Sequence, residues 1–161
     1  MKDDLKIAII GGGAAGFFSA LSVKDHYPNS SVTIFEKSNK LLSKVKISGG
    51  GRCNVTNATY DIKELSMNYP RGGNFLKKAF GQFNTIDTVE WFENRGVLLE
   101  TLNDNCIFPK SNTSQSIIDC FINQAKIKGV EILLKTGVEK IRNDEDTFIL
   151  YSQENKFKFD K

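Results

Sequence analysis

The hydrophobic positions near the start of the chain form two short apolar runs separated by a mixed segment. Ile7–Ile10 is a continuous apolar run with the length of a buried strand, and Ser31–Phe35 is a second one. Between them, Phe17–His26 has the composition and length of a helix, and His26 falls at its C-terminal end, where the helix dipole favours it. The pattern predicts a β–α–β unit with two parallel strands and a connecting helix.

The turn between the first strand and the helix has the sequence Gly11-Gly12-Gly13-Ala14-Ala15-Gly16, a Gly-x-Gly-x-x-Gly pattern. Gly11 permits a tight turn, Gly13 lets a pyrophosphate approach the backbone, and Gly16 lets the helix pack closely on the sheet. The start of the helix adds free N–H groups and a positive dipole end. Glu36 follows the second strand, where it can accept hydrogen bonds from ribose hydroxyls and would repel a 2′-phosphate. The unit therefore predicts a dinucleotide site for which NADP is the least suitable ligand.

The rest of the chain predicts further helices and strands that serve as a scaffold. Lys37–Asn57 has no helical period and is expected to be a loop. Apolar side chains at helical spacing predict core-facing helices; those side chains are Phe75, Phe80, Phe83, Ile86, Val89, Trp91 and Phe92. The expected elements are helices at 74–83, at 85–95 and from a cap at Thr113 or Ser114 to Lys128, and strands at 97–100, 106–108, 130–134, 138–142 and 147–151.

Composition places the chain among ordinary globular proteins. Its 161 residues fit one domain, with 40% hydrophobic residues, 25% charged residues and a formal net charge of +3. The basic residues are scattered among acids, which argues against a nucleic-acid partner. No run approaches the length of a membrane span and no signal peptide is evident, so we expect no membrane association and a cytoplasmic location.

The cysteine and histidine content limits the chemistry. Cys53, Cys106 and Cys120 form no Cys-x-x-Cys pair, which fits reduced thiols, and His26 is the single histidine. We therefore expect no metal site and no histidine-based catalytic triad. Without a second cysteine close by, Cys53 is expected to pack rather than to act in redox chemistry.

A second glycine-rich stretch, Ser48-Gly49-Gly50-Gly51-Arg52-Cys53-Asn54, follows the β–α–β unit. Its backbone can pass close to a ligand, and Arg52 offers a planar set of donors for a phosphate or a flat ring. Asn54 and Asn57 suit tight turns, and their amides can hydrogen-bond a ring edge. The alternative, a flexible surface loop, stays open at this point.

The element Gly-Gly-Gly-Arg-Cys-Asn-x-Thr-Asn, placed after a β–α–β unit that ends in Glu-Lys, resembles a family of bacterial flavoproteins. These are the NAD(P)/FAD-dependent, aminoacetone-oxidase-like oxidoreductases, which include reductases of dehydro bile acids. The resemblance covers essentially the whole chain, and further matching positions are Lys40-Leu41, Lys44, 75–80, Gly96-Val97, Phe108-Pro109, 129–132 and Val138. The chain departs from the family pattern at Leu42 and Ser43, which replace a glycine and its basic neighbour, and at Cys106, which replaces an arginine.

This resemblance implies FAD as the cofactor, with NAD(P)H as a candidate electron donor and a small-molecule substrate of unknown identity. It places the pyrophosphate at Gly11, Gly13, Ala14, Ala15 and Gly16, and the adenosine ribose at Glu36 with Lys37 beside it. It places Lys44 and the loop of Ser48, Gly49, Gly50, Gly51, Arg52, Cys53 and Asn54 along the pyrophosphate and toward the flavin. Val138 would contact the adenine through its backbone.

The expected fold is an α/β, Rossmann-like three-layer FAD/NAD(P)-binding domain with a parallel sheet and a smaller β layer. Residues 1–161 would form the N-terminal part of a glutathione-reductase-like flavoprotein, ending before the substrate domain and the C-terminal FAD segment. No residue stands out as a catalytic acid or base. Two alternatives remain: an NAD-dependent dehydrogenase module, and an inactive, truncated dinucleotide-binding fragment. The oligomeric state is open.

Overall fold

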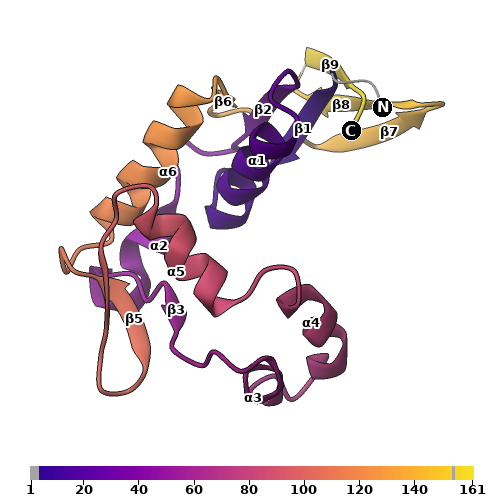
Figure 1. Ribbon diagram of the computed structural model, residues 1–161. Coiled ribbons are helices and arrows are strands. Elements are labelled where there is room, and N and C mark those ends of the chain that lie inside the picture. Colours follow the sequence, from indigo (N-terminus) through magenta and orange to yellow (C-terminus); the bar gives the residue numbers. More distant parts are fainter. Residues whose placement is uncertain (1–3, 154) are drawn as a thin grey trace. The chain divides into compact units, whose positions relative to one another are not determined.

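The computed structural model describes residues 4–153 and 155–161 (Figure 1). The chain divides into two compact units. The first unit is formed by Met1–Lys44 with Phe121–Lys161, and the second by Val45–Cys120. Helix α6 (Gln115–Ile127) begins in the second unit and ends in the first.

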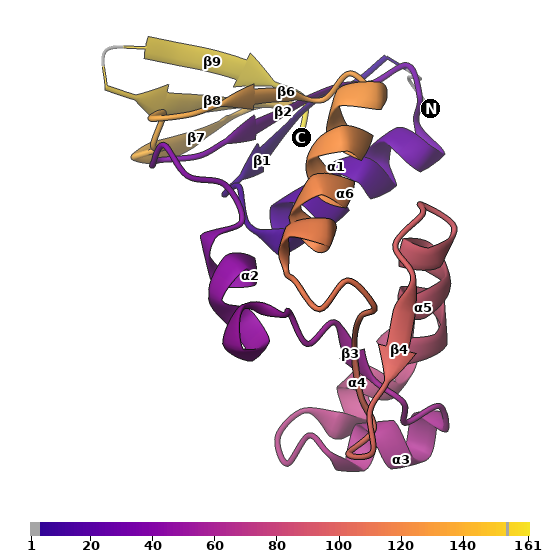
Figure 2. The same ribbon diagram turned by 90° about the vertical axis from the view of Figure 1, so that its left-hand side faces the viewer.

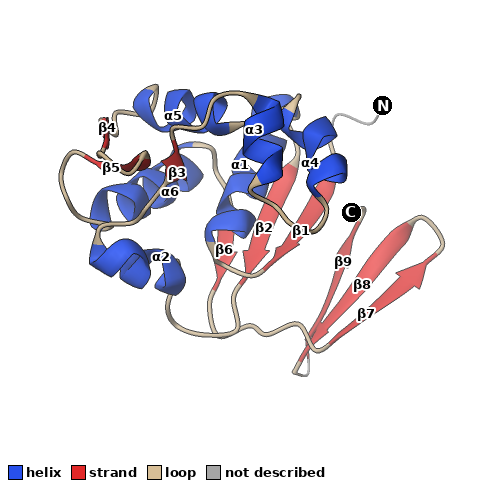
Figure 3. Ribbon diagram, turned by 90° about the horizontal axis from the view of Figure 1, so that it is seen from below, coloured by secondary structure: helices blue, strands red, loops and turns tan. Residues whose placement is uncertain are grey.

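A three-stranded parallel sheet forms the centre of the first unit. Its strands are β1 (Lys6–Ile10), β2 (Ser31–Phe35) and β6 (Glu131–Leu133), in the order β1-β2-β6. Helix α1 (Ala14–His26) connects β1 to β2, which completes the predicted β–α–β unit (Figure 3). Residues 32–35 of the middle strand are all buried, because β2 has a neighbouring strand at each edge. His26 is the last residue of α1, as predicted.

Helices cover the parallel sheet of the first unit. Figure 2 shows helices α1 and α6 beside this sheet. Phe17, Ala20 and Leu21 of α1 are fully buried, and the ring of Phe17 lies 5.9 Å from that of Phe121 in α6. Helix α6 ends before Gly129, whose φ of +66° turns the chain toward β6. The contact between Phe17 and Phe121 thus joins the two helices to each other.

A second sheet of the first unit is an antiparallel meander. Strands β7 (Lys140–Asp144), β8 (Thr147–Ser152) and β9 (Asn155–Phe159) lie in sequence order. Phe35 of β2 forms a buried cluster with Leu150 and Phe159, and edge-to-face ring contacts join it to Phe157 at 5.1 Å and to Phe159 at 5.6 Å. The fold is therefore α/β and Rossmann-like, with a parallel sheet and a smaller β layer, which confirms the prediction.

The second unit contains short helices and a small antiparallel sheet. The helical elements are α2 (Ser43–Ile47), the 3₁₀ turn η1 (Ser48–Gly51), α3 (Ile62–Met67), α4 (Gly73–Phe80) and α5 (Thr85–Glu93). The strands are β3 (Thr56–Asn57), β4 (Leu99–Thr101) and β5 (Cys106–Pro109), in the order β3-β5-β4. Asn84 begins α5 with a capping box, in which its side chain accepts from Ile86 N and Asp87 accepts from Asn84 N.

Several predictions for the second unit are wrong in detail. The expected loop 37–57 contains α2, η1 and β3, and α3 was not predicted. Phe92 is core as expected, but Phe75, Phe83 and Ile86 are 78%, 37% and 42% exposed. A helical period marks an apolar side of a helix without showing that anything covers it. None of the helices in the described residues is both long and apolar enough to cross a bilayer.

The approach of α1 to β1 predicts the effect of one substitution. A Cβ atom on Gly16 would lie 1.9 Å from the carbonyl oxygen of Gly11, whereas a Cβ on Gly13 would have no atom within 4 Å. We expect Gly16→Ala to lower the free energy of unfolding by about 1–3 kcal/mol, since backbone must move to make room. Chemical denaturation followed by circular dichroism measures the change. Gly13→Ala is the matched control, and an equal effect of both variants would contradict the close-packing role of Gly16.

Candidate functional site

The glycine-rich turn leaves the start of α1 open. Gly13 is the N-cap residue of α1, no side chain caps the helix, and its first turn carries no acid. The first helical hydrogen bond runs from Phe17 N to Gly13 O at 3.0 Å, so the N–H groups of Ala14, Ala15 and Gly16 have no partner within the helix. Gly13, Ala14 and Ala15 are exposed. Three free donors, a positive dipole end and open space at Gly13 together suit a pyrophosphate.

Glu36 joins the end of β2 to this turn. Its Oε2 accepts a hydrogen bond from Gly12 N at 2.9 Å, and its Oε1 accepts one from Ser38 N at 2.7 Å. The hydrogen bond from Ser38 N, together with the bond from Gly12 N, lowers the pKa of the Glu36 carboxyl below its ordinary value. The bond from Ser38 has the larger effect, and burial opposes the shift. The carboxylate is therefore ionised at neutral pH, and each oxygen retains capacity to accept from a ribose hydroxyl. The sequence indicated the ribose role but not the bonds to the turn.

The predicted adenine-contacting segment lies beside Glu36 and Lys37. Thr136 N donates to Glu36 O at 2.9 Å, and a Cβ on Gly137 would come within 3.1 Å of the Lys37 Cβ. The side chain of Val138 packs on the Phe35 cluster. In the part of the chain that the structure describes, the N–H and C=O groups of Val138 have no backbone partner. Free backbone groups at this place are what a contact to an adenine edge requires.

The segment before α2 closes over the middle glycine of the pattern. Leu42 N donates to Gly12 O at 2.9 Å, and a Cβ on Gly12 would lie 2.5 Å from Leu41 Cδ2. Gly12 is therefore needed in this chain, although it occupies an unspecified position of the Gly-x-Gly-x-x-Gly pattern. The contacts with Leu41 and Leu42 reveal this need for glycine, and the Gly-x-Gly-x-x-Gly pattern alone does not predict it. Lys44, the second residue of α2, is exposed.

The second glycine-rich stretch is an ordered left-handed turn. Gly49, Gly50 and Gly51 have φ values of +54°, +67° and +88°. Hydrogen bonds from Cys53 N to Ser48 O and from Ser114 N to Gly51 O close the turn and anchor it. These hydrogen bonds give the stretch a defined shape, and its contact with a ligand stays a prediction.

Arg52 is held flat beside the same turn. Its guanidinium carbon lies 4.3 Å from the centroid of the Phe108 ring, and its Nε donates to Gly49 O at 3.3 Å. The remaining donors of the guanidinium can face a phosphate or a ring system. Asn54 is exposed.

The cysteines are free thiols. Cys53 is buried at a φ of +66°, which agrees with the packing role expected for it. Burial and, to a lesser extent, the neighbouring Asp104 carboxylate raise the pKa of Cys106, which favours the neutral thiol. This thiol stands at the position where the family pattern described above has an arginine.

The predicted site residues thus fall into two groups. The first unit brings together the turn, Glu36 and the segment around Val138. This group consists of Gly11, Gly13, Ala14, Ala15, Gly16, Glu36, Lys37 and Val138. Lys44 also belongs to the first unit, as the last residue of its segment Met1–Lys44. The second unit contains the loop residues Ser48, Gly49, Gly50, Gly51, Arg52, Cys53 and Asn54.

The lowered pKa of Glu36 predicts an acid-dependent loss of stability. A carboxyl whose pKa falls on folding stabilises the protein above its unfolded pKa, about 4.5, and this contribution is lost as the pH falls through the folded pKa. We expect Glu36→Gln to be less stable at pH 7 by roughly 1.5 kcal/mol, the low end for hydrogen bonds to a charged group. The deficit should shrink as the pH falls below the unfolded pKa of about 4.5 and through the lower folded pKa.

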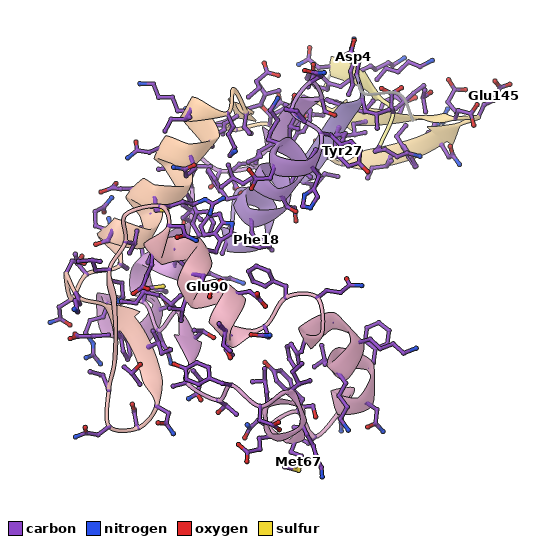
Figure 4. The ribbon with its side chains drawn as sticks, in the orientation of Figure 1. Asp4, Phe18, Tyr27, Met67, Glu90 and Glu145 are labelled. Carbon is purple, nitrogen blue, oxygen red and sulfur yellow. The ribbon has the colours of Figure 1, made fainter. Side chains whose placement is uncertain are left out.

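Chemical denaturation of both proteins between pH 7 and pH 3 measures this difference. The control is Glu90→Gln, at an exposed position of α5 (Figure 4). A deficit for Glu36→Gln that does not change with pH would show that the ionised carboxylate does not stabilise the turn.

The glycine turn generates a matched pair of substitutions. Gly49 and Gly50 have similar left-handed backbones, but only a Cβ on Gly49 would lie 2.8 Å from both Asn54 N and Phe108 Cε1; a Cβ on Gly50 meets nothing within 4 Å. Gly49→Ala should therefore destabilise the chain by about 1–3 kcal/mol more than Gly50→Ala, measured by chemical denaturation. Equal losses would mean that the contact with Phe108 does not constrain the turn.

Comparison with known proteins places this arrangement in a family. A protein-family model described as the HI0933-like protein Rossmann domain matches residues 5–161. The 3-dehydro-bile acid delta(4,6)-reductase of Clostridium scindens is 26% identical over 156 residues, which are 97% of this chain and 37% of the reductase. The ribosomal RNA dihydrouridine synthase of Haemophilus influenzae is 30% identical over 140 residues, 85% of this chain and 33% of that protein.

The chain spans about a third of the length of these curated relatives. Among solved structures, the open conformation of a flavocytochrome c3 fumarate reductase has a TM-score of 0.60 and 20% identity, covering 98% of this chain and 32% of that one, and so shows the same fold. Because the family model matches nearly every residue, the chain belongs to the HI0933-like Rossmann-domain family, a family of FAD-binding flavoprotein oxidoreductases.

Proposed function

We propose that this chain is the FAD-binding part of a flavin oxidoreductase. The observation that carries the proposal is the start of α1, which no side chain caps. Its first N–H groups have no partner within the helix, and a Cβ on Gly13 would have no atom within 4 Å. The carboxylate of Glu36 lies at the same turn, which favours an unphosphorylated ribose over the 2′-phosphate of NADP.

The residues present fit the ADP half of FAD. Ala14, Ala15 and Gly16 would donate to the pyrophosphate, Glu36 would accept from the ribose, and the backbone of Val138 would meet the adenine. Lys37 and Lys44 would add positive charge beside the phosphates.

The glycine-rich loop of the second unit would lie along the pyrophosphate and toward the flavin. The left-handed turn of Gly49–Gly51 lets backbone approach a ligand, and Arg52, fixed on Phe108, presents donors to it. When bound, FAD would supply the redox chemistry, the transfer of electrons from a donor to a substrate. The proposed donor is NAD(P)H, and the role of this chain is to bind and orient the cofactor.

For the whole protein, we propose reduction of a carbon–carbon double bond in an electron-poor ring system. The support comes from the relatives' names: one is a delta(4,6)-reductase of a dehydro bile acid, and the other forms dihydrouridine, in which a ring double bond of uridine is saturated. Both names describe the addition of hydrogen across a ring double bond. The substrate of this protein is then a ring of this chemical class.

The dehydrogenase alternative accounts for less of the chain. An NAD module needs the β–α–β unit but not the turn of Gly49–Gly51 with Arg52 held on Phe108. The inactive-fragment alternative keeps the fold and loses the chemistry, and a binding measurement separates it from the proposal.

Titration of the purified chain with FAD and, separately, with NAD tests the proposed cofactor. We expect flavin fluorescence to report FAD binding, with no thermal stabilisation by NAD. Gly13→Val should weaken FAD binding roughly 100-fold, or by about 2.7 kcal/mol, because the side chain blocks the approach of the pyrophosphate. The melting temperature should stay close to that of the parent, since a Cβ at Gly13 has no atom within 4 Å.

The control is Ala79→Val, at an exposed position of α4. Binding of NAD alone would replace the proposal with the dehydrogenase module. Binding of neither ligand by a folded sample would contradict it in favour of an inactive fragment. Unchanged FAD affinity in Gly13→Val would show that the pyrophosphate lies elsewhere.

A further inference from the structure

Ser114 is a buried residue that bonds to the glycine-rich loop of the second unit with both its backbone and its side chain. Its N–H donates to Gly51 O at 2.8 Å, and its Oγ donates to Lys46 O at 2.9 Å. Lys46 precedes the turn of Gly49–Gly51 and lies 68 positions before Ser114 in the sequence, and Gly51 ends the turn. One distant residue thus holds the turn at both ends.

The carbonyl groups at the end of α2 need partners from outside that helix. A helix leaves its last carbonyls without an N–H partner, and α2 has only five residues. The carbonyl of Val45 accepts from Ser48 Oγ at 2.9 Å, and that of Lys46 accepts from Ser114 Oγ. Gly51 returns to the same place, since a Cβ on it would lie 4.0 Å from Lys46 O. The hydroxyl of Ser114 therefore bonds to the chain where the loop begins and ends.

The position of Ser114 at the start of α6 makes the direction of its hydroxyl informative. A bond from Ile118 N to Ser114 O at 3.1 Å begins the helix, so Ser114 is its N-cap residue. A serine at this position ordinarily accepts from an N–H group in the first turn of its own helix. Within residues 4–153 and 155–161, no N–H group of α6 bonds to this hydroxyl, and Gln115 N donates to Thr113 Oγ1 at 3.3 Å instead. The hydroxyl serves the loop and not the helix.

The turn of Gly49–Gly51 depends on such bonds, because glycine has more backbone freedom than any other residue. A bond from Cys53 N to Ser48 O closes the loop on itself. The two bonds to Ser114 attach it to the start of α6. Since Arg52 directly follows the last of the three glycines, these bonds also determine where its guanidinium lies.

We propose that Ser114 is a positioning residue for the flavin cofactor. By holding the loop at both ends, it sets where the backbone of Gly49–Gly51 and the guanidinium of Arg52 meet FAD, and it acts through the loop. This inference rests on the proposed function, since it requires the loop to lie along the pyrophosphate and toward the flavin. The sequence predicted Ser114 only as one of two caps for a helix, and its bond to Lys46 is a tertiary contact.

Titration of Ser114→Ala with FAD tests the inference. The variant loses the bond to Lys46 O and keeps the N–H that bonds to Gly51 O. We expect roughly fivefold weaker FAD binding, the effect of one hydrogen bond, because the loop loses one of its two attachments to α6. The visible circular dichroism of bound FAD, recorded at saturating cofactor, should also change, since it reports the groups around the isoalloxazine ring.

Thr85→Val is the matched control. Thr85 is also buried in the second unit, and its Oγ1 donates to Thr59 O at 2.8 Å. Both substitutions therefore remove a buried hydroxyl that bonds to a backbone carbonyl. We expect chemical denaturation to show similar losses of stability in the two variants. Only Ser114→Ala should change the FAD affinity and the visible spectrum of the bound flavin.

The parent chain and the two variants distinguish the possible failures. Unchanged FAD affinity and an unchanged flavin spectrum in Ser114→Ala would overturn the inference and leave the proposed function standing. An equal loss of FAD affinity in Thr85→Val would assign the effect to stability, which also overturns the inference. A folded parent chain that binds no FAD would overturn the proposed function and this inference together.

Discussion

The close approach of α1 to the end of β1 is the constraint on which the first unit depends. The carbonyl oxygen of Gly11 occupies the place where any side chain at residue 16 would begin, at 1.9 Å from its Cβ. Only glycine lets the helix start there, and this start presents uncapped N–H groups at the carboxyl end of the parallel strands. The proposed anion site and the packing of helix on sheet therefore both depend on glycine at position 16.

The sequence predicted those parts of the molecule that local patterns determine. The β1–α1–β2 unit and Glu36 were predicted because apolar runs and glycine spacing act over neighbouring residues. Strand β3 could not be predicted, because its two residues are a strand only through pairing with Ile107 and Cys106, some fifty positions away. Nor could the exposure of Phe75 be predicted, since helical spacing does not reveal whether a partner covers that side. The bond from Gly12 of the turn to Glu36 was hidden for the same reason: it is a tertiary contact.

Glu36 shows how one side chain can serve both stability and recognition. By accepting from Gly12 N and Ser38 N, the carboxylate fixes the turn in the shape that exposes the start of α1. In the proposed cofactor site, the same ionised group accepts hydrogen bonds from the ribose. Since both roles need the negative charge, the hydrogen bonds that lower its pKa also prepare it as an acceptor.

Leu42 has a left-handed backbone in the segment that closes over Gly12. The resemblance given above implies a glycine at this position, and Leu42 adopts a φ of +53° while its N–H bonds to Gly12 O. A left-handed backbone costs a non-glycine residue about 1–2 kcal/mol. Burying a leucine side chain gains roughly 1.5–3 kcal/mol, and Leu42 is only 1% exposed. Burial thus offsets the strain, so the segment closes over Gly12 with a leucine at this position.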